Sequence, residues 1–267
     1  QRNPANPRSP ANPALKRNSI VPKYTESIHT LALVGHGGAG KTTLAAALLW
    51  KSGAIASPGS VEKGTTVCDF DPMAKAYGHS LGSSLVNFAY EDMRIHLIDT
   101  PGMPDFAGQS IAALAAVETA VVVINAQNGI ELNTSRMMKW AKTRGLCRMV
   151  VVNKIDADNV DLPGLLRKIQ DHFGKECLPI NLPAHDRKDV VDCFFTPDGD
   201  ADFVGVKAAH TAIVEQVVEV DDDLMSLYLE QGEDLKPEQL HAPFEKALRE
   251  GHLVPVCFTS ARTGAGI

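Results

Sequence analysis

Long apolar runs are missing from this 267-residue sequence. None approaches the roughly 20 residues that a membrane-spanning helix needs, and the apolar central run of a secretory signal is also missing, so we expect no contact with a membrane. Cysteine is scarce, and the spacing of the five cysteines matches no metal site. We expect all of them to be reduced core residues of a cytoplasmic protein: Cys68, Cys147, Cys177, Cys193 and Cys257.

Positive charge is concentrated in the first 29 residues. This segment is rich in Pro and Asn, holds five Lys or Arg against one Glu, and has no apolar periodicity, so we predict a disordered tail over residues 1–29. Its Arg and Ser content also suggests an organelle transit peptide, but the prolines interrupt the amphipathic helix that such a peptide needs. Because the whole chain carries −6 and the tail +4, residues 30–267 carry −10. A domain this acidic is not expected to bind nucleic acid directly, since phosphate neutralisation needs clustered Lys and Arg.

Short β-rich runs alternate with helical patterns along the rest of the chain. The runs occupy residues 30–35, 85–90, 94–99, 120–125, 148–153 and 254–260. Four of them have the pattern of fully buried strands rather than of alternating ones, which is typical of parallel strands covered by helices on both faces. The link Glu91-Asp92 is too short for a crossover and indicates a hairpin. We therefore predict an α/β fold with a mostly parallel sheet, one antiparallel strand and helices on both faces.

The segments between the strands have helical patterns. They occupy residues 41–52, 108–119, 133–145 and 162–174. Residues 182–250 are predicted to form an inserted subdomain before the last strand, with a short strand in 189–195 and helices at 209–219, 222–232 and 236–251. No internal repeat is present. The length suits a single domain over residues 30–267 that carries this insertion.

The stretch "GHGGAGKT" at residues 35–42 follows a predicted strand and begins a predicted helix. This is the phosphate-binding loop pattern in the context that supports it, since glycines let backbone N–H groups turn inward around a phosphate. Lys41 is expected to bridge the β- and γ-phosphates, and the Thr42 hydroxyl to ligate Mg²⁺. The alternative is a glycine-rich turn without a ligand. The predicted nucleotide-binding residues here are Gly35, His36, Gly37, Gly38, Ala39, Gly40, Lys41, Thr42 and Thr43.

The stretch "HLIDTPGMPDF" carries a second element of the site. Asp99 ends a strand predicted to lie beside the first one, so its carboxylate is expected to reach the same Mg²⁺ directly or through water. Gly102 can turn its N–H toward the γ-phosphate. A sequence Asp-Thr-Pro-Gly alone is weak support, but its place after a strand and downstream of the phosphate loop strengthens it.

Two further motifs predict which base is bound. In "NKID", the carboxylate of Asp156 can accept hydrogen bonds from N1 and the exocyclic amine of guanine, a donor pair that adenine lacks. Asn153 is expected to contact the phosphate loop and N7, while the stem of Lys154 covers the base. In "TSA", Ser260 and Ala261 follow the last strand, where a backbone N–H can meet guanine O6. The alternative for "NKID" alone is an ordinary surface loop, but the four motifs in order predict GTP and GDP as ligands.

These motifs resemble those of the translational GTPases, and most closely elongation factor G and its paralogues. The resemblance covers residues 28–267 through "GHGGAGKTT", "DTPGMPDF", "VNKID" and "TSA", with the family-like phrases "GSVEKGTTVCDFDP", "INAQNGIELNT" and "DDLMSLYLEQGEDL". It implies a P-loop GTPase fold, hydrolysis of GTP to GDP and phosphate, a monomer, and the ribosome as the partner of the full-length protein. The chain ends near the point where that family's second domain begins, so further domains are expected after Ile267.

Three positions depart from the family pattern. Ser80 stands where the family has the Mg²⁺-binding threonine of its first switch, and it keeps a hydroxyl. Gly38 replaces an aspartate thought to help hold a monovalent cation. Met103 replaces the histidine that orients the attacking water, and a thioether is a weak acceptor with no proton to give. Losing such a group typically costs on the order of 10² to 10⁴ in rate.

His79 suggests a compensation for Met103. The family has an apolar isoleucine at that place in the first switch, so the chemical characters of the two positions look exchanged. Either His79 faces the attacking water, or it points to solvent and hydrolysis is slow. We therefore name Lys41, Gly102, Met103 and His79 as catalytic candidates, and Thr42, Ser80 and Asp99 as metal ligands.

Three functions remain open from the sequence. The first is a Mg²⁺-dependent GTPase switch directed to the ribosome, which changes conformation when the γ-phosphate leaves. The second is a nucleotide-gated binding module with negligible hydrolysis. The third, a P-loop ATPase or kinase, is disfavoured by Asp156.

Overall fold

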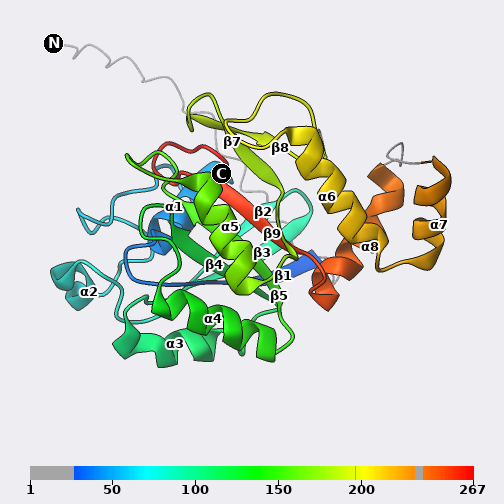
Figure 1. Cartoon of the computed structure of the whole chain (residues 1–267). Coiled ribbons are helices and arrows are strands. Elements are labelled where there is room, and N and C mark those ends of the chain that lie inside the picture. The colour runs from blue at the N-terminus through cyan, green and yellow to red at the C-terminus, as the bar shows by residue number, and fades with distance from the viewer. Residues whose placement is uncertain (1–26, 196, 232–236) are drawn as a thin grey trace, which may run out of the picture.

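The computed structural model describes residues 27–195, 197–231 and 237–267 (Figure 1). Most of the predicted tail lies outside these residues. Its boundary at residue 29 is wrong, however, because the first strand, β1 (Ile28–Val34), already includes Ile28 and His29. Both residues pair with strand β3, and His29 Nδ1 lies 2.9 Å from Glu118 Oε1, so tertiary contacts place them in the sheet.

A seven-stranded sheet forms the centre of the molecule, in the order β2-β3-β1-β4-β5-β9-β6. Its other strands are β2 (Ser84–Tyr90), β3 (Met93–Asp99), β4 (Thr119–Asn125), β5 (Cys147–Asn153), β6 (Cys177–Pro179) and β9 (Val254–Thr259). The pair β2 and β3 is antiparallel, and all other pairs are parallel. The predicted fold class is confirmed. Strand β6 was missed because three residues are too short to show a pattern.

Helices cover both faces of this sheet (Figure 1). They are α1 (Lys41–Lys51), α2 (Pro72–Tyr77), α3 (Ala107–Ala113), α4 (Leu132–Thr143), α5 (Leu162–Phe173), α6 (Val206–Val218), α7 (Asp222–Gln231) and α8 (Pro237–Glu250), with a 3-10 turn at Pro104–Phe106. Helix α3 ends earlier than the predicted 108–119, because the Glu118 amide and carboxylate are both hydrogen-bonded to Thr30 of β1. Helix α2 was not expected; Asp71 caps it and Pro72 begins it.

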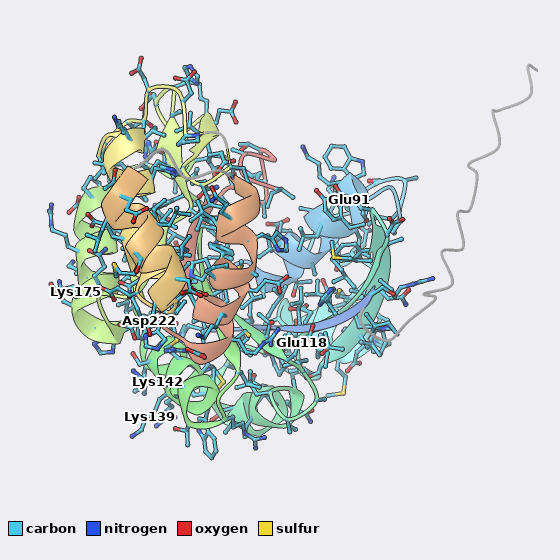
Figure 2. All side chains as sticks on the ribbon, turned by 90° about the vertical axis from the view of Figure 1, so that its right-hand side faces the viewer. Glu91, Glu118, Lys139, Lys142, Lys175 and Asp222 are labelled. Carbon is cyan, nitrogen blue, oxygen red and sulfur yellow. The ribbon has the colours of Figure 1, made fainter. Side chains whose placement is uncertain are left out.

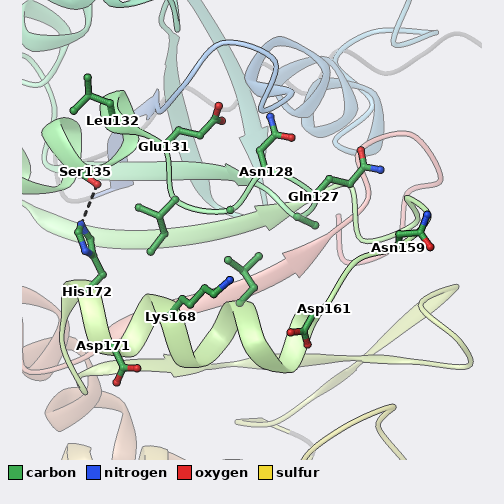
Figure 3. Close-up of a pocket in the computed structure, with 14 residues that line it drawn as sticks. Gln127, Asn128, Glu131, Leu132, Ser135, Asn159, Asp161, Lys168, Asp171 and His172 are labelled. Atoms are coloured by element: carbon green, nitrogen blue, oxygen red, sulfur yellow. Dashed lines mark hydrogen bonds between the residues drawn. The ribbon is translucent and has the colours of Figure 1, made fainter.

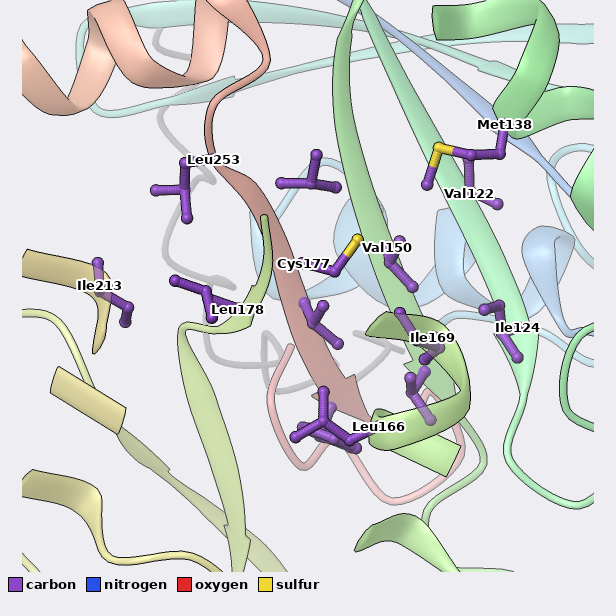
Figure 4. Packing of buried hydrophobic residues seen from close by; sticks show 14 of the residues in the cluster. Val122, Ile124, Met138, Val150, Leu166, Ile169, Cys177, Leu178, Ile213 and Leu253 are labelled. Atoms are coloured by element: carbon purple, nitrogen blue, oxygen red, sulfur yellow. The ribbon is translucent and has the colours of Figure 1, made fainter. Parts of the chain in front are cut away.

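Successive side chains of the central strands supply two separate cores. On one face, Leu33, Val121 and Val123 pack with α1. On the other, Val122 and Ile124 pack with α3, α4 and α5, where Figure 4 shows them near Ile169 and Val150. This alternation follows from the two-residue period of a strand. It explains why residues 120–124 of β4 are all apolar, and the packing on both faces fixes the carboxyl end of β4 next to Gly35 of the phosphate loop.

The inserted segment consists of a hairpin and three helices. Strands β7 (Asn181–Ala184) and β8 (Asp189–Asp192) form a separate two-stranded sheet, and α6, α7 and α8 lead back to β9. The strand predicted at 189–195 therefore ends three residues early; the Asp192 carboxylate accepts the amides of Phe194 and Phe195 and turns the chain there. Phe194 stacks on Phe244 of α8 with ring centroids 4.3 Å apart, which joins the hairpin side of the insertion to its helices.

The five cysteines are free thiols. Three of them are buried, as predicted: Cys68, Cys177 and Cys193. Cys147 and Cys257 are only partly buried. Burial raises the pKa of each of the three buried thiols to about 12, so these groups stay protonated and unreactive near neutral pH.

Two surface lysines form ion pairs with acidic residues. Lys175 Nζ lies 2.8 Å from Asp171 Oδ1, and Lys142 Nζ lies 3.7 Å from Glu176 Oε1; both lysines are labelled in Figure 2. Such pairs reduce the local positive potential that binding to a phosphate backbone needs. In the described part of the chain, no helix has the length and apolarity that crossing a bilayer requires.

Candidate functional site

The phosphate loop connects the carboxyl end of β1 to the amino end of α1. Its last glycine, Gly40, has φ 89°, and a Cβ there would lie 2.5 Å from Asn153 Nδ2, so only glycine fits. The first turn of α1 contains no acidic residue and begins at Lys41. Unpaired N–H groups and the positive end of the helix dipole therefore face the loop, which is an arrangement that binds anions.

Lys41 is buried at the base of this loop. Its Nζ donates to the carbonyls of His36 at 2.8 Å and Gly35 at 3.1 Å. Burial lowers the pKa of Lys41 to about 8, while the charges of Asp99 and Glu131 act in the opposite direction. The ammonium is thus held against backbone carbonyls, where it can transfer its hydrogen bonds to a phosphate.

The three predicted metal ligands meet at the start of α1. Thr42 Oγ1 donates to Asp99 Oδ2 at 2.6 Å and lies 3.3 Å from Ser80 Oγ. The second carboxylate oxygen, Asp99 Oδ1, is buried and has no hydrogen-bond partner. Burial raises the pKa of Asp99 to about 6, against the Thr42 hydrogen bond and the charge of Lys41.

This donor set fits a hard divalent cation. Two hydroxyls and one carboxylate are oxygen ligands of the kind that Mg²⁺ takes beside phosphates. A bound cation would give Asp99 Oδ1 the partner that it lacks and favour the ionised carboxylate. Among the described residues, no cluster of three His, Cys, Asp or Glu offers a competing metal site.

Gly102 lies against the phosphate loop. A Cβ on it would come within 2.4 Å of Lys41 Nζ and 2.5 Å of the Gly37 nitrogen, so glycine permits this approach. The next residue, Met103, places its Sδ 2.9 Å from where a Cβ on Gly37 would be. Met103 is 37% exposed. Its thioether therefore covers the loop at the side where the γ-phosphate is predicted to lie.

His79 contacts the segment that carries Met103. Its ring centroid lies 6.3 Å from that of Phe106, in the 3-10 turn that Met103 precedes, and 6.1 Å from that of Tyr77. Its Nδ1 lies 3.5 Å from the Ser80 carbonyl oxygen. The two positions of the proposed exchange are thus on adjacent segments. Gly38, the third departure, has open space where a side chain would project.

Asn153 joins the phosphate loop to the predicted base-binding loops. Its Nδ2 donates to the Ala39 carbonyl at 3.0 Å, and its Oδ1 accepts from the Ala261 amide at 3.0 Å and from Thr259 Oγ1 at 3.4 Å. The prediction was that a backbone N–H of the segment Ser260-Ala261 meets guanine O6, and in this structure the Ala261 N–H is bonded to Asn153. Lys154 has φ 65°, and its Cε lies 3.6 Å from the Cβ position of Gly40, so its stem runs beside the loop.

Asp156 lies at the open end of this arrangement. Its Oδ1 accepts from Ser260 Oγ at 2.6 Å, and its Oδ2 lies 3.4 Å from Arg262 Nε. The side chain of Arg262 is highly exposed, so this ion pair is weak and can open. The structure thus brings together the predicted base contacts from the ends of β5 and β9.

Asn133, near the start of α4, was missed from the sequence. Its buried Nδ2 donates to the Gly102 carbonyl at 3.0 Å and to the Gly35 carbonyl at 3.4 Å, so it ties the phosphate loop to the segment of Met103. Nearby, Glu131 Oε1 lies 3.4 Å from His36 Nε2. The sequence feature that could have identified Asn133 is the polar stretch after the strand at 120–125, which lies at the same sheet edge as the other motifs.

A cavity of about 630 Å³ lies beside the site, between the β4–α4 loop and α5 (Figure 3). Glu131 lines it, and Ser135 Oγ lies 3.0 Å from His172 Nε2 across it. None of the predicted nucleotide or metal ligands lines this cavity. The candidate site is instead the shallow surface formed by the phosphate loop and the loops after β3, β5 and β9.

Comparison with known proteins agrees with this geometry. The family described as "Elongation factor Tu GTP binding domain" matches residues 26–267. A protein of Mycobacterium tuberculosis strain H37Rv, "Elongation factor G-like protein", is 34% identical over 253 residues, which cover 90% of this chain and 35% of the relative. A Thermotoga maritima protein of the same description is 30% identical over 254 residues, covering 91% and 36%.

Two further similarities extend this comparison. "Tetracycline resistance protein TetO" of Streptococcus mutans is 30% identical over 241 residues, covering 90% of this chain and 35% of the relative. A crystal structure of a Thermus thermophilus protein superposes with a TM-score of 0.81 at 35% identity, covering 90% of this chain and 38% of that one. The chain spans about a third of the length of the relatives that it matches.

Proposed function

The chain belongs to the elongation factor Tu GTP-binding domain family, a family of translational GTPases, and from this premise we propose that it is a Mg²⁺-dependent GTP-hydrolysing switch of a ribosome-directed factor. The observation that carries the proposal is the bridging by Asn153. Its hydrogen bonds to Ala39 and Ala261 fix the phosphate-binding and base-binding ends of the site relative to each other. A guanosine nucleotide is recognised at these same two ends, at its phosphates and at its base.

The phosphate end of the nucleotide is assigned to the loop and its lysine. The N–H groups at the start of α1 and Lys41 Nζ hold the β- and γ-phosphates, and Gly102, close to Lys41, supplies a further N–H. Thr42, Ser80 and Asp99 hold Mg²⁺, which when bound offsets negative charge on the phosphates. Met103 keeps the side of the γ-phosphate apolar.

The base end of the nucleotide is assigned to Asp156. Its carboxylate accepts from N1 and the exocyclic amine of guanine, with Lys154 beside the base. Isothermal titration calorimetry with GTP, GDP and ATP, with and without Mg²⁺, tests this assignment. Equal affinity for GTP and ATP would overturn the proposed function.

A binding module with negligible hydrolysis is the second candidate, and Met103 favours it. A thioether cannot hold an attacking water as an imidazole does. Multiple-turnover phosphate release, with and without ribosomes, separates the two candidates. Turnover that rises with ribosomes supports the switch, whereas GTP binding without turnover in both conditions supports the module.

The ribosome as partner and further domains after Ile267 belong to the same proposal. They rest on the relatives, of which this chain spans about a third. Those relatives include both elongation factor G-like proteins and a tetracycline resistance protein, so the particular role of the factor would depend on domains outside this chain.

Thr42→Ala is expected to remove the tightening of GTP binding by Mg²⁺, a loss of about tenfold, because the ligating hydroxyl is gone. Calorimetry in Mg²⁺ and in EDTA measures it. Thr143→Ala, the same change at an exposed position of α4, is the control and should keep the Mg²⁺ effect. Full Mg²⁺ dependence in Thr42→Ala would contradict the assignment.

Ser80→Ala is expected to spare GDP affinity and to loosen the first switch in the GTP state alone. The reason is that the γ-phosphate would hold the first switch in the arrangement where Ser80 Oγ lies 3.3 Å from Thr42 Oγ1, whereas GDP would leave the switch free to move. Limited proteolysis of residues 52–83, with GDP and with a nonhydrolysable GTP analogue, measures this order, and the GDP sample is the internal control. Identical digestion of the unaltered protein in both states would count against the switch.

A further inference from the structure

The inserted hairpin contacts the loop that carries Asp156 and also strand β9, which leads into Ser260. We propose that Arg187, in the turn between β7 and β8, is a positioning residue for guanine recognition, because it holds the loop that presents Asp156. This inference rests on the proposed function and adds to it a residue from the insertion. Through Arg187, the insertion would influence the position of Asp156 and thereby the binding of the nucleotide.

The first observation is a long-range hydrogen bond. Arg187 Nη1 donates to the Ala157 carbonyl at 2.8 Å, across 30 positions of sequence. Ala157 directly follows Asp156, and its own amide donates to the Lys154 carbonyl at 3.1 Å. Ala157 is therefore held at its amide by the Lys154 carbonyl and at its own carbonyl by Arg187. These two bonds fix the turn that carries Asp156.

The second observation is that the hairpin turn is held in an unusual backbone conformation. His185, Asp186 and Arg187 have φ of 54°, 56° and 62°, a left-handed conformation that costs free energy for residues other than glycine. The Asp202 carboxylate stabilises it by accepting the amides of Asp186 at 3.0 Å and Arg187 at 2.8 Å. Because these bonds fix the backbone of Arg187, they also fix the direction in which its side chain extends toward Ala157.

The third observation is that the same hairpin is fixed to β9. Asn181, at the start of β7, accepts the Phe258 amide at 2.7 Å and donates to the Phe258 carbonyl at 3.1 Å. Phe203, next to Asp202, packs edge-on against Phe258 with ring centroids 5.6 Å apart. The end of β9 leads into Ser260, whose hydroxyl donates to Asp156.

The charges favour positioning over direct base contact. Arg187 Nη1 donates to a backbone carbonyl, and Arg187 Nη2 lies 3.8 Å from Asp186 Oδ1. Arg187 therefore does not occupy the Asp156 carboxylate, which stays available for the base. Inosine nucleotides keep the N1–H of guanine but lack the exocyclic amine. A displaced Asp156 therefore loses more affinity for GDP than for IDP, which a general loss of stability would not produce.

The test compares GDP and IDP affinities in four proteins: the unaltered chain, Arg187→Ala, Arg187→Lys and Lys188→Ala. Arg187→Ala is expected to weaken GDP about tenfold and IDP about threefold or less. Arg187→Lys should recover part of the GDP to IDP ratio, because an ammonium can donate one bond but lacks the planar fork. Lys188→Ala removes a neighbouring exposed charge and should leave the ratio unchanged.

Asp202→Asn provides a second route to the same readout, since its amide can accept fewer of the two turn N–H groups. Asp202→Asn should change the ratio of GDP affinity to IDP affinity in the same direction by a smaller factor. If Arg187→Ala does not fold, Asp202→Asn and Arg187→Lys still test the inference. An unchanged ratio in the folded Arg187 and Asp202 variants would overturn the inference. Failure of the unaltered chain to prefer GDP over ADP would instead overturn the proposed function.

Discussion

Asp156→Asn is expected to weaken GTP binding by about 2 to 4 kcal/mol, roughly 30-fold to 1000-fold, and to create a preference for xanthine nucleotides. The carboxylate pairs with two donors of guanine, whereas an amide presents one acceptor and one donor group. Xanthine carries a carbonyl where guanine has its exocyclic amine, so the amide suits it better. Calorimetry with GTP and XTP measures both changes.

Asp158→Asn is the matched control for this substitution. It removes the same charge two residues further along, at an exposed position, and should leave both affinities unchanged. In Asp156→Asn the Ser260 hydroxyl can still donate to the amide oxygen, so the loop should keep its conformation. A loss of GTP affinity without any gain in XTP affinity would indicate that the substitution disrupts the loop and would contradict the base assignment.

The sheet and the nucleotide motifs were predictable because their signals are local. In the run 148–153, residues 149–152 are all apolar because both faces of the strand are covered, and the strand observed, Cys147–Asn153, differs by one residue. The motif that follows it, from Asn153 to Asp156, needs its residues in order on one turn. Its position at the sheet edge then follows from the parallel topology.

The contacts between distant elements were not predictable in the same way. Asn133 binds the Gly35 carbonyl across 98 positions, and Arg187 binds the Ala157 carbonyl across 30. Neither contact leaves a spacing pattern in the sequence, because the acceptors are backbone atoms that every residue has. In the bond between Ala261 and Asn153 the donor is a backbone amide, so this contact likewise leaves no spacing pattern in the sequence.

Met103 takes its position from the absence of a side chain at Gly37. Its Sδ occupies the space next to that glycine, so the apolar cover over the phosphate loop comes from Met103 itself. His79 has ring contacts with Tyr77 and Phe106. An imidazole in contact with two aromatic rings is less free to turn toward an attacking water, which favours slow intrinsic hydrolysis over the exchange of roles between His79 and Met103.

Met103→His is therefore expected to raise the single-turnover rate of GTP hydrolysis, with ribosomes present, on the order of 10². An imidazole at this position, beside Gly37 of the phosphate loop, can accept a hydrogen bond from water beside the γ-phosphate. Met73→His, at an exposed position of α2, is the control for adding an imidazole to a switch segment and should not change the rate.

His79→Ala decides between the two accounts of this site. If Met103 marks a slow switch, His79→Ala should hydrolyse GTP at the rate of the unaltered protein, and the double variant with Met103→His should be as fast as Met103→His alone. If His79 holds the water, its removal should slow hydrolysis by about tenfold or more, which is about 1.4 kcal/mol of barrier, and Met103→His should restore much of that loss. A slow His79→Ala variant with unchanged GTP affinity would thus overturn the slow-switch account and assign the water to the first switch, because the substitution would then have changed the chemical step and not the binding.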